Sequence, residues 1–324
     1  MIPFAKPMID AMDIAAVVAA LHNSRLTEGP IVEEFEKAFG EMHDGHAVAV
    51  SNCTAALFLA FTHYRRQIDV NPVTMTAMTH VATAHAAEMA GITVQFTDCG
   101  ENGRTGFLPV GVSYLGAPAQ GKVLDYATAV GLPCGDSIAC YSFYPAKHIT
   151  TGEGGMIVCK SAKVATWFRR VRAFGKVTKD GKFDVIDSGL NFRMSEINGA
   201  LGLAQLRHLP RWLATRKRNY ETLAEELPLR VLDTSGGSYY ALAAYVPDGV
   251  DRDAFRGRLL RRGVETSVYY PVPIPRLTYY QSRHKDWRFP NAERIAAHSI
   301  AFPIGPHIGE NELEQIIGAV RKTL

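Results

Sequence analysis

Short apolar runs alternate with helical patterns along the first two thirds of the chain, and this alternation restricts the fold more than any other feature. Strands that alternate with helices form parallel sheets, whose buried strands read as continuous apolar runs. We therefore predict an α/β fold with a mainly parallel sheet. One expected helix opens at Thr79 as a possible N-cap and closes at Gly91. The expected strands are residues 47–50, 92–97, 122–127, 137–143 and 156–159, and the helices between them are 54–66 and 79–90.

The last third of the chain has a different order of elements. At 324 residues the chain exceeds the usual size of one domain. We predict a large domain over residues 1–205 and a smaller α+β domain over residues 206–324. Its expected elements are a connecting helix at 210–227, strands at 239–246 and 264–270, and helices at 252–262 and 310–324.

Charge and cysteine content argue against several classes of protein. The formal charge is +3, with acids and bases mixed along the chain, so no large field favours nucleic acid or an anionic membrane. The basic run 211–218 is interpreted as a solvated helix face. The five cysteines are irregularly spaced without a CxxC pair, which favours a reducing, cytoplasmic location. Acids and prolines stand where a signal peptide needs an apolar run, and residues 14–21 are too few to span a bilayer, so we expect a soluble protein.

Polar residues at the ends of two expected strands are candidates for binding a ligand, because ligands of open α/β sheets lie beyond the carboxyl ends of strands. Residues 51–54, which include Cys53 and Thr54, join a strand to a helix whose free N–H groups and positive end suit a phosphate. An ordinary polar N-cap is the alternative. Asp125 ends the run KVLD and could hold a cationic ring nitrogen in its protonated form, whereas a loop cap is its alternative role.

The run SFYPAKHITTGEGG, residues 142–155, is the most informative stretch. In it, Ser142 and Lys147 follow a strand and precede a glycine-rich turn. A lysine near a strand end can be partly desolvated and act as a nucleophile toward carbonyls, although a surface lysine is the alternative. The glycines permit close approach of the backbone to a ligand, but they match neither GxxxxGK[ST] nor GxGxxG.

A further segment, SGLNFRMSEINGALG, places Asn191 and Arg193 before a helix that we expect to begin near Ser195. A structural loop is the alternative interpretation. The histidines are scattered, and His80 and His85 are poorly spaced for one helical face. We therefore expect no metal site.

Taken in this order, these segments resemble the DegT/DnrJ/EryC1/StrS family of sugar aminotransferases, which use pyridoxal 5'-phosphate (PLP) and have the fold type I architecture. The resemblance covers nearly the whole chain, and the joint match is far more specific than any single segment. It rests on the blocks IPFAKP, LTEGPIVEEFEKAF, SNCTAALFLAF, THVATAHA, LDYATAVG, SFYPAKHITTGEGG, GLNFRMSEINGALGLAQL and VETSVYYPVP.

The resemblance implies a role for each matched residue. Lys147 would bind PLP as a Schiff base and move protons during catalysis, and Asp125 would pair with the pyridine nitrogen. His80 would stack on the cofactor ring. The backbone amides of Cys53 and Thr54, together with the hydroxyl of Ser142, would hold the phosphate. Asn191 matches an asparagine that reaches the phosphate of the neighbouring subunit, which implies an obligate homodimer.

The sequence departs from the family pattern at several positions. Thr128 stands where Gln or His usually touches the phenolic oxygen of the cofactor, so its shorter side chain is expected to reach only through water. Cys53 replaces a common glycine, and Tyr269 replaces a frequent histidine. The run PVGVSYLGAPAQGKVLDYA lacks a helix that the family normally inserts, although a parallel crossover usually needs about a dozen residues. We expect the sheet edge there to be exposed or covered by a partner.

The function implied by the resemblance is transfer of an amino group from an amino acid to a keto group of a nucleotide-linked deoxysugar. Glutamate is the expected amino donor. Pyridoxamine phosphate (PMP) would link the two half-reactions. Cyclitols and aminated aromatic precursors are alternative substrates, because one fold supports many functions. A related PLP-dependent sugar dehydratase, a lyase with histidine in place of the lysine, is the main rival, and His148 lies next to Lys147. A catalytically silent relative is the remaining alternative.

Overall fold

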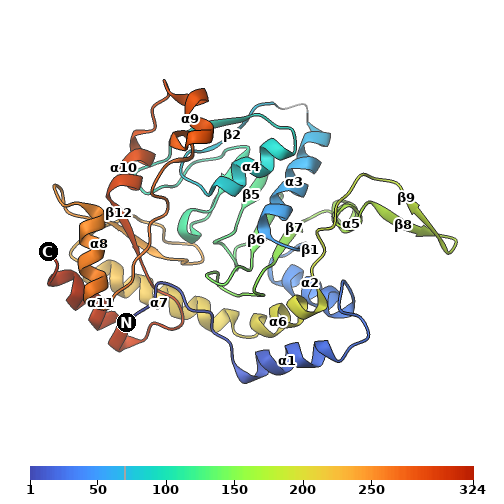
Figure 1. Cartoon of the computed structure of the whole chain (residues 1–324), viewed down its shortest axis with the longest axis horizontal. Helices are drawn as coiled ribbons and strands as arrows, with labels where there is room; N and C mark the ends of the chain where they lie inside the picture. Colours follow the sequence, from blue (N-terminus) through green and yellow to red (C-terminus); the bar gives the residue numbers. More distant parts are fainter. Residues whose placement is uncertain (69–70) are drawn as a thin grey trace.

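The computed structural model describes residues 1–68 and 71–324 of the chain. At its centre lies a five-stranded sheet with the order β1-β7-β6-β5-β4 (Figure 1). Within it β7 is antiparallel to both β1 and β6, whereas β6, β5 and β4 are parallel. The predicted, mainly parallel sheet is confirmed. The strands are β1 (His46–Val50), β4 (Val110–Val112), β5 (Val123–Asp125), β6 (Ile138–Ser142) and β7 (Gly155–Cys159).

Side chains of the central strands alternate between two buried faces, as the period of a strand requires. Val48 and Val50 of β1 belong to one core cluster, with residues of α3 (Cys53–Gln67), α4 (Val81–Met89) and α5 (Ala162–Val171). Ala47 and Ala49 belong to a second cluster, with residues of α2 (Pro30–Met42). Helices therefore cover both faces of the sheet, which is why its strands read as continuous apolar runs.

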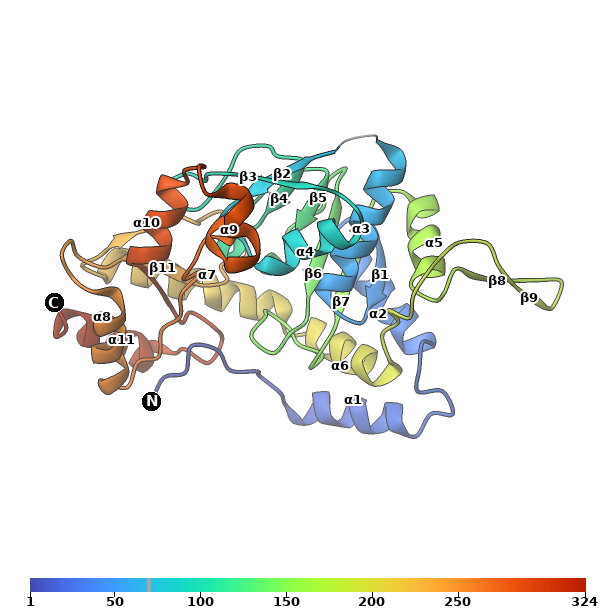
Figure 2. The ribbon, with the colours of Figure 1, turned by 45° about the horizontal axis from the view of Figure 1, so that its top comes forward.

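A parallel pair formed by β2 (Val73–Thr76) and β3 (Val94–Thr97) lies next to β4 (Figure 2). The chain itself thus covers the side of β4 that faces away from β5, and the prediction of an exposed or partner-covered edge is wrong. The short link between β4 and β5, residues 113–122, replaces a helix by the 3-10 turn η1 (Tyr114–Gly116). The Gly116 carbonyl of this link accepts the N–H of Ser238. A segment distant in the sequence is therefore bonded to the short link that takes the place of the helix.

The C-terminal third forms a second sheet, with the antiparallel order β10-β11-β12, over a third core cluster. The long helix α7 (Leu209–Glu226) starts in the second cluster with Leu209 and ends in the third with Leu223. The N-terminal segment of the chain also reaches this cluster through Ile2. The other elements are β10 (Arg230–Val231), β11 (Leu242–Tyr245), α8 (Arg252–Arg261), η2 (Ile274–Arg276), α9 (Thr278–His284), α10 (Pro290–His298), β12 (Ser299–Phe302) and α11 (Glu310–Arg321).

Two further features lie outside these layers. Helices α1 (Ala11–Leu21) and α6 (Glu196–Leu206) pack against each other beside α2 (Figure 1). The hairpin of β8 (Lys176–Lys179) and β9 (Lys182–Val185) projects from the body and exposes Phe183 at 67% (Figure 2). In the described part of the chain, no helix combines the length and apolarity that a membrane span requires.

Three predictions are wrong in detail. Residues 264–270 form only isolated bridges, because Val264 pairs with Ile2 whereas Ser267 pairs with Ala301 of β12, and this change of partner prevents a ladder. His80, not Thr79, caps α4 by accepting the N–H of Ala82. Arg216 does not belong to a solvated face, because it is buried beside Tyr240.

Candidate active site

A cavity of about 400 Å³ lies at the carboxyl ends of β4, β5 and β6, between the N-termini of α3 and α4. It brings together most of the residues singled out in the sequence, although they come from distant parts of the chain. Parallel strands place their carboxyl ends at the same side of a sheet, which explains this convergence. The lining residues include Cys53, Thr54, His80, Asp125, Thr128, Ser142 and Lys147.

The N-terminus of α3 forms one end of the cavity. The side chain of Asn52 caps the helix by accepting the N–H of Ala55 at 2.9 Å. The N–H groups of Cys53 and Thr54 then stand in the first turn, where a helix offers no internal acceptor. Gly155 of β7 packs against this turn so closely that a Cβ would lie 2.7 Å from the Cys53 nitrogen. Any side chain at residue 155 would therefore displace this turn, residues 52–55, which the sequence predicts to bind an anion and which we call the anion-binding turn.

Asp125 ends β5 and is only 6% exposed. Its Oδ2 accepts a hydrogen bond of 2.5 Å from the Thr83 hydroxyl, and its Oδ1 accepts the Ala127 N–H at 3.1 Å. Thr83 also contacts the Thr79 hydroxyl at 3.1 Å. These contacts fix the carboxylate with one face toward the cavity, where a cationic ligand nitrogen would complete its hydrogen bonds.

Lys147 reaches the same cavity from the turn after β6. Its Nζ lies 5.1 Å from the centroid of the Tyr240 ring, whose hydroxyl is 3.0 Å from the Tyr269 hydroxyl. Lys147 is partly buried, and Ser142 on the same segment is buried. The next residue, His148, points away, because it is buried with Nε2 2.9 Å from the Ser238 carbonyl oxygen.

His80 lies at the start of α4, next to Tyr270, with ring centroids 5.8 Å apart and planes inclined by 59°. Desolvation lowers the pKa of its imidazole, although the charge of Asp125 acts in the opposite direction. The ring therefore presents a neutral aromatic surface at neutral pH. Such a surface is suited to stacking on a planar ligand.

Thr128 and Cys53, two residues that depart from the family pattern, have defined contacts in the structure. Thr128 donates its hydroxyl to the Ser113 carbonyl at 2.6 Å and accepts the Gly116 N–H at 3.2 Å. The hydroxyl therefore stabilises the short β4–β5 link. The thiol of Cys53 lies 3.6 Å from the Cys140 carbonyl oxygen, and burial raises its pKa. It is a neutral thiol that leaves the backbone amides of the turn free.

Asn191 is exposed and does not line the cavity, unlike the other candidates. Its Oδ1 accepts a 3.0 Å hydrogen bond from Arg193. The adjacent Phe192 joins this loop to the anion-binding turn, because its carbonyl accepts the Ser51 N–H at 2.8 Å. The loop is thus held next to the end of β1, and the exposed Asn191 side chain is not part of the cavity lining of its own chain.

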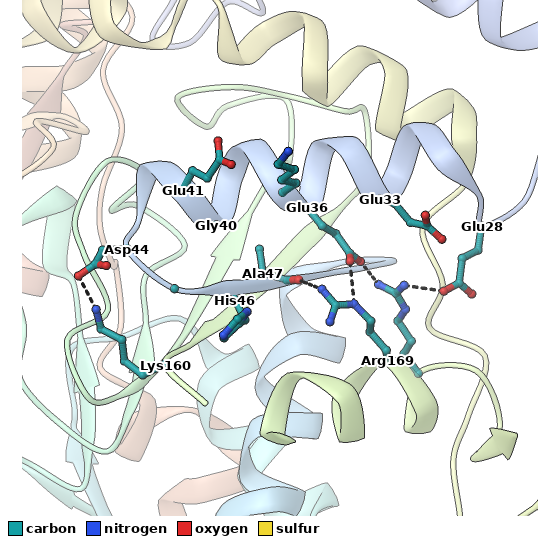
Figure 3. A pocket seen from close by; sticks show the side chains of 13 residues that line it. Glu28, Glu33, Glu36, Gly40, Glu41, Asp44, His46, Ala47, Lys160 and Arg169 are labelled. Carbon is teal, nitrogen blue, oxygen red and sulfur yellow. Dashed lines mark hydrogen bonds and ion pairs between the residues drawn. The ribbon is translucent and has the colours of Figure 1, made fainter. Parts of the chain in front are cut away.

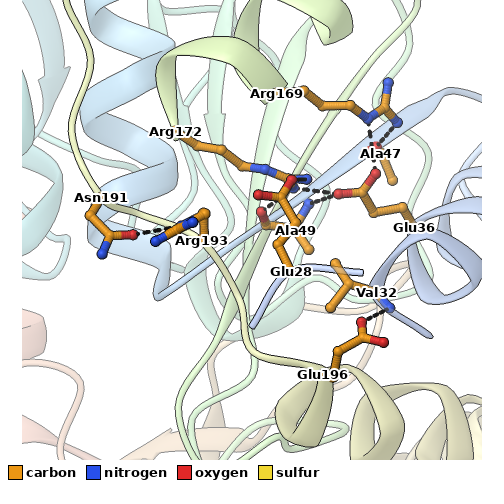
Figure 4. A network of polar contacts seen from close by, with 10 residues as sticks. All are labelled: Glu28, Val32, Glu36, Ala47, Ala49, Arg169, Arg172, Asn191, Arg193 and Glu196. Carbon is orange, nitrogen blue, oxygen red and sulfur yellow. Dashed lines mark hydrogen bonds and ion pairs between the residues drawn. The ribbon is translucent and has the colours of Figure 1, made fainter. Parts of the chain in front are cut away.

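A buried ionic network supports the same region. Arg172 pairs with Glu36 and Glu28 and donates to the Ala49 carbonyl (Figure 4). Its own carbonyl accepts the Phe192 N–H at 2.8 Å. The network therefore connects α2, the last turn of α5 and the strand that leads to the anion-binding turn.

A larger cavity, of about 770 Å³, lies between α2, β1 and α5 (Figure 3). Several of its charged side chains pair with one another, as in the Arg169–Glu36 contact at 2.9 Å and the Lys160–Asp44 contact. It lies apart from Lys147 and Asp125. Its size therefore does not make it the better candidate for catalysis.

The one group of metal-ligating side chains found in the described ranges consists of Asp10, Asp13 and His208, far from the cavity. Asp10 and Asp13 form the capping box of α1, and His208 Nε2 lies 3.2 Å from Asp10 Oδ2. Each carboxylate thus already has protein hydrogen-bond partners.

Sequence reasoning missed Thr83, Tyr240 and Arg216. Thr83 lies in α4 among small residues, and the sequence suggests only a packing role for them. Its hydrogen bond to Asp125 joins a helix to a strand, so no local pattern indicates it. Tyr240 had no motif of its own. Arg216 could have been noticed through helical spacing, because it shares a face with the buried residues Trp212 and Tyr220.

The chain has the same fold as Helicobacter pylori PseC, an aminotransferase involved in the biosynthesis of pseudoaminic acid, which superposes with a TM-score of 0.90. That match covers 99% of this chain and 98% of PseC at 23% identity. The DegT/DnrJ/EryC1/StrS aminotransferase family model matches residues 7–104 and 116–321, and the chain belongs to this family. The break in the match, at residues 105–115, includes β4 and the start of the short link.

Two relatives of known role align over nearly their whole lengths. The chain is 27% identical to the spore coat polysaccharide biosynthesis protein SpsC of Bacillus subtilis, over 99% of this chain and 96% of that protein. It is 26% identical to a UDP-4-amino-4,6-dideoxy-N-acetyl-beta-L-altrosamine transaminase of Campylobacter jejuni, over 94% of this chain and 92% of that protein. The chain is therefore a PLP-dependent aminotransferase, as its sequence predicted.

Proposed function

We propose that this enzyme transfers an amino group from glutamate to a keto group of a nucleotide-linked deoxysugar, with Lys147 as the catalytic lysine. The observation that supports this most is the convergence of Lys147, Asp125, Ser142 and the first turn of α3 on one cavity. The similarity to a transaminase of a UDP-linked amino sugar supports the substrate class.

The residues of the cavity fit PLP. The N–H groups of Cys53 and Thr54 and the Ser142 hydroxyl would hold the phosphate, since a helix N-terminus binds anions without a further cation. At the other end, Asp125 would pair with the pyridine nitrogen, and His80 would cover the ring. When bound, PLP supplies an electron sink that stabilises negative charge on the substrate carbon and carries the amino group as PMP.

Lys147 has two tasks in this account. Its amine would hold the cofactor covalently at rest. Once the amino group of the substrate had taken its place, the freed Nζ would take a proton from the substrate carbon and return it to the cofactor carbon to complete the transfer. The Tyr240 ring beside Nζ keeps the amine in the cavity. Asp125 keeps the ring nitrogen protonated throughout, and the buried hydroxyl of Thr83 keeps the carboxylate oriented.

The position of His148 favours this account over a lyase with a catalytic histidine. Its side chain contacts Ser238 and does not line the cavity, whereas Lys147 does. An alignment shifted by one residue would give His148 the role of Lys147, although the His148 side chain does not line the cavity.

The working enzyme in this proposal is a cytoplasmic homodimer in which Asn191 of each chain reaches the phosphate of the other. The exposed position of Asn191, outside its own cavity, supports this assignment. The projecting hairpin of β8 and β9, with its exposed Phe183, provides apolar surface near the same loop. The proposal includes neither a membrane nor a nucleic acid as a partner.

The test of the proposed function is the absorbance of the purified holoenzyme. Glutamate should convert the PLP form to the PMP form, and a keto-sugar nucleotide should restore the first spectrum. A screen of such sugars identifies the acceptor. Restoration by simple keto acids or cyclitol ketones, with no response to any keto-sugar nucleotide, would contradict the assigned substrate class.

A further inference from the structure

Arg216 is a buried cation whose charge no acidic side chain of the described chain neutralises. It is 6% exposed, and its only hydrogen bond to a described residue runs from Nη1 to the Tyr240 carbonyl at 2.9 Å. Its Nε is buried without a partner. The desolvation of a buried guanidinium costs more free energy than one hydrogen bond to a carbonyl returns. Arg216 is therefore suited to bind an anion that the described part of the chain does not itself supply.

The free atoms of Arg216 form the edge that recognises carboxylates. Nη1 is engaged by Tyr240, which leaves Nε and Nη2 on the same side of the planar guanidinium. This pair of donors matches the two oxygens of a carboxylate. Desolvation lowers the pKa of Arg216 to about 10, so the group is still charged at neutral pH.

A small pocket joins Arg216 to the catalytic lysine. It has room for only about 10 Å³, and its walls include Lys147, Tyr240, Arg216, His307 and Lys6. Three of its residues, Ala146, Lys147 and Tyr240, also line the 400 Å³ cavity of the candidate active site, so the two spaces meet at Lys147. The walls carry several basic side chains and no acidic one among the described residues.

A glycine next to the pocket leaves space beside Arg216. A Cβ on Gly305 would lie 2.8 Å from His307 Nδ1 and 3.5 Å from Arg216 Nη2. The glycine thus leaves free space next to the donor edge. His307 donates through Nε2 to the Pro3 carbonyl at 3.0 Å, and its Nδ1 is buried without a partner.

We propose that Arg216 binds the α-carboxylate of the amino donor, in a subsite between Lys147 and Gly305. The inference rests on the proposed function, because it assigns the donor part of that site. The free volume accommodates about one oxygen atom, so it suits a carboxylate oxygen that enters beside Lys147 and excludes a diphosphate. The amino group of the donor would be held next to Lys147, and its α-carboxylate is attached to the same carbon as that amino group, so the carboxylate would lie within reach of this pocket.

The experiment compares two donors in the first half-reaction of the holoenzyme, glutamate and isoglutamine, in which the α-carboxylate is an amide. Wild-type enzyme should give half-maximal conversion at a concentration of glutamate about 10 to 100 times lower than of isoglutamine, as expected for charge-assisted hydrogen bonds. In Arg216→Gln the ratio of these two concentrations should fall to nearly one, and in Arg216→Lys the ratio should be intermediate. Reaction of the PMP form with the keto-sugar nucleotide should keep its concentration dependence.

Matched variants separate this effect from misfolding and from general charge. Lys217→Gln removes an exposed cation from the same helix turn and should keep the wild-type preference. Gly305→Ala leaves Arg216 in place but fills the space beside it, and it should also reduce the preference for glutamate. If Arg216→Gln does not fold, Gly305→Ala alone decides the question.

Three results would overturn the proposal. They are an unchanged preference in both Arg216→Gln and Gly305→Ala, an equal loss in Lys217→Gln, or a loss confined to the keto-sugar half-reaction, which would assign the anion to the nucleotide phosphate. Failure of wild-type enzyme to react with any amino acid would instead refute the proposed function, and is recognised before any variant is made.

Discussion

The hydroxyl of Thr83 donates a 2.5 Å hydrogen bond to Oδ2 of Asp125, and both residues are buried. The bond joins the first turn of α4 to the end of β5, so the helix that presents His80 to the cavity also orients the carboxylate. Since the Ala127 N–H engages the other oxygen, rotation of the carboxylate would break two contacts.

Thr83→Val should keep the fold and lower turnover. Valine has nearly the shape of threonine, but it cannot donate to Asp125, and hydrogen bonds to charged groups contribute about 1.5–3 kcal/mol. A loss of this size corresponds to a reduction in kcat of about 10-fold to 100-fold. Steady-state kinetics measure it, with Thr62→Val as the control, because Thr62 bonds only to the Phe58 carbonyl of its own helix. Equal rates in the two variants would show that Thr83 does not position Asp125.

Asp125→Asn should bind PLP and turn over poorly. An amide is neutral, so it cannot keep the pyridine nitrogen protonated, whereas the anion-binding turn of α3 remains intact. Cofactor titration by absorbance and kcat on the same sample separate binding from catalysis. A near-normal rate would restore the alternative in which Asp125 only caps a loop.

Thr128→Val should leave the spectrum of the bound cofactor almost unchanged but destabilise the protein. The Thr128 hydroxyl has two backbone partners, Ser113 and Gly116, and valine would leave them buried without it. The expected cost is about 1–3 kcal/mol of unfolding free energy. Denaturant unfolding measures the cost, and a large shift of the absorbance maximum would show instead that the threonine touches the cofactor.

The elements that the sequence predicted well are those with a strong local signal. The five predicted strands of the first two thirds all occur within a few residues, because each contributes apolar side chains to the buried core. Asp125, Ser142 and Lys147 follow strand ends directly, so the sheet topology brings them together. The site could be predicted to this extent from order along the chain.

Other features depend on contacts between distant segments and have no local pattern. The Thr83–Asp125 bond spans a helix and a strand, and the partner change of residues 264–270 depends on where Ile2 and β12 lie. Arg216 stands in a basic run that reads as solvated, yet its side chain lies on the buried face of α7 with Trp212 and Tyr220. In each case tertiary packing decides the outcome.

Asn191 tests whether two chains share each active site. Asn191→Ala should weaken cofactor binding by roughly 1 to 3 kcal/mol, because one hydrogen bond to a phosphate is lost. Co-expression of Lys147→Ala and Asn191→Ala chains should restore activity, since a mixed dimer places both lesions in one site and leaves the other intact. If Asn191 serves its own chain, mixing restores nothing, and a monomer by light scattering at working concentration would also refute the shared site.

Identification of the lysine that holds the cofactor tests the central claim most directly. The holoenzyme is reduced with borohydride, digested, and the labelled peptide is mapped by mass spectrometry. The label is expected on Lys147, in the peptide that follows Ser142, and Lys147→Ala should keep its fold, take up no label and lose transamination. A label on Lys160, Lys163 or any other lysine would contradict the assignment of the catalytic residue and of the cavity around it.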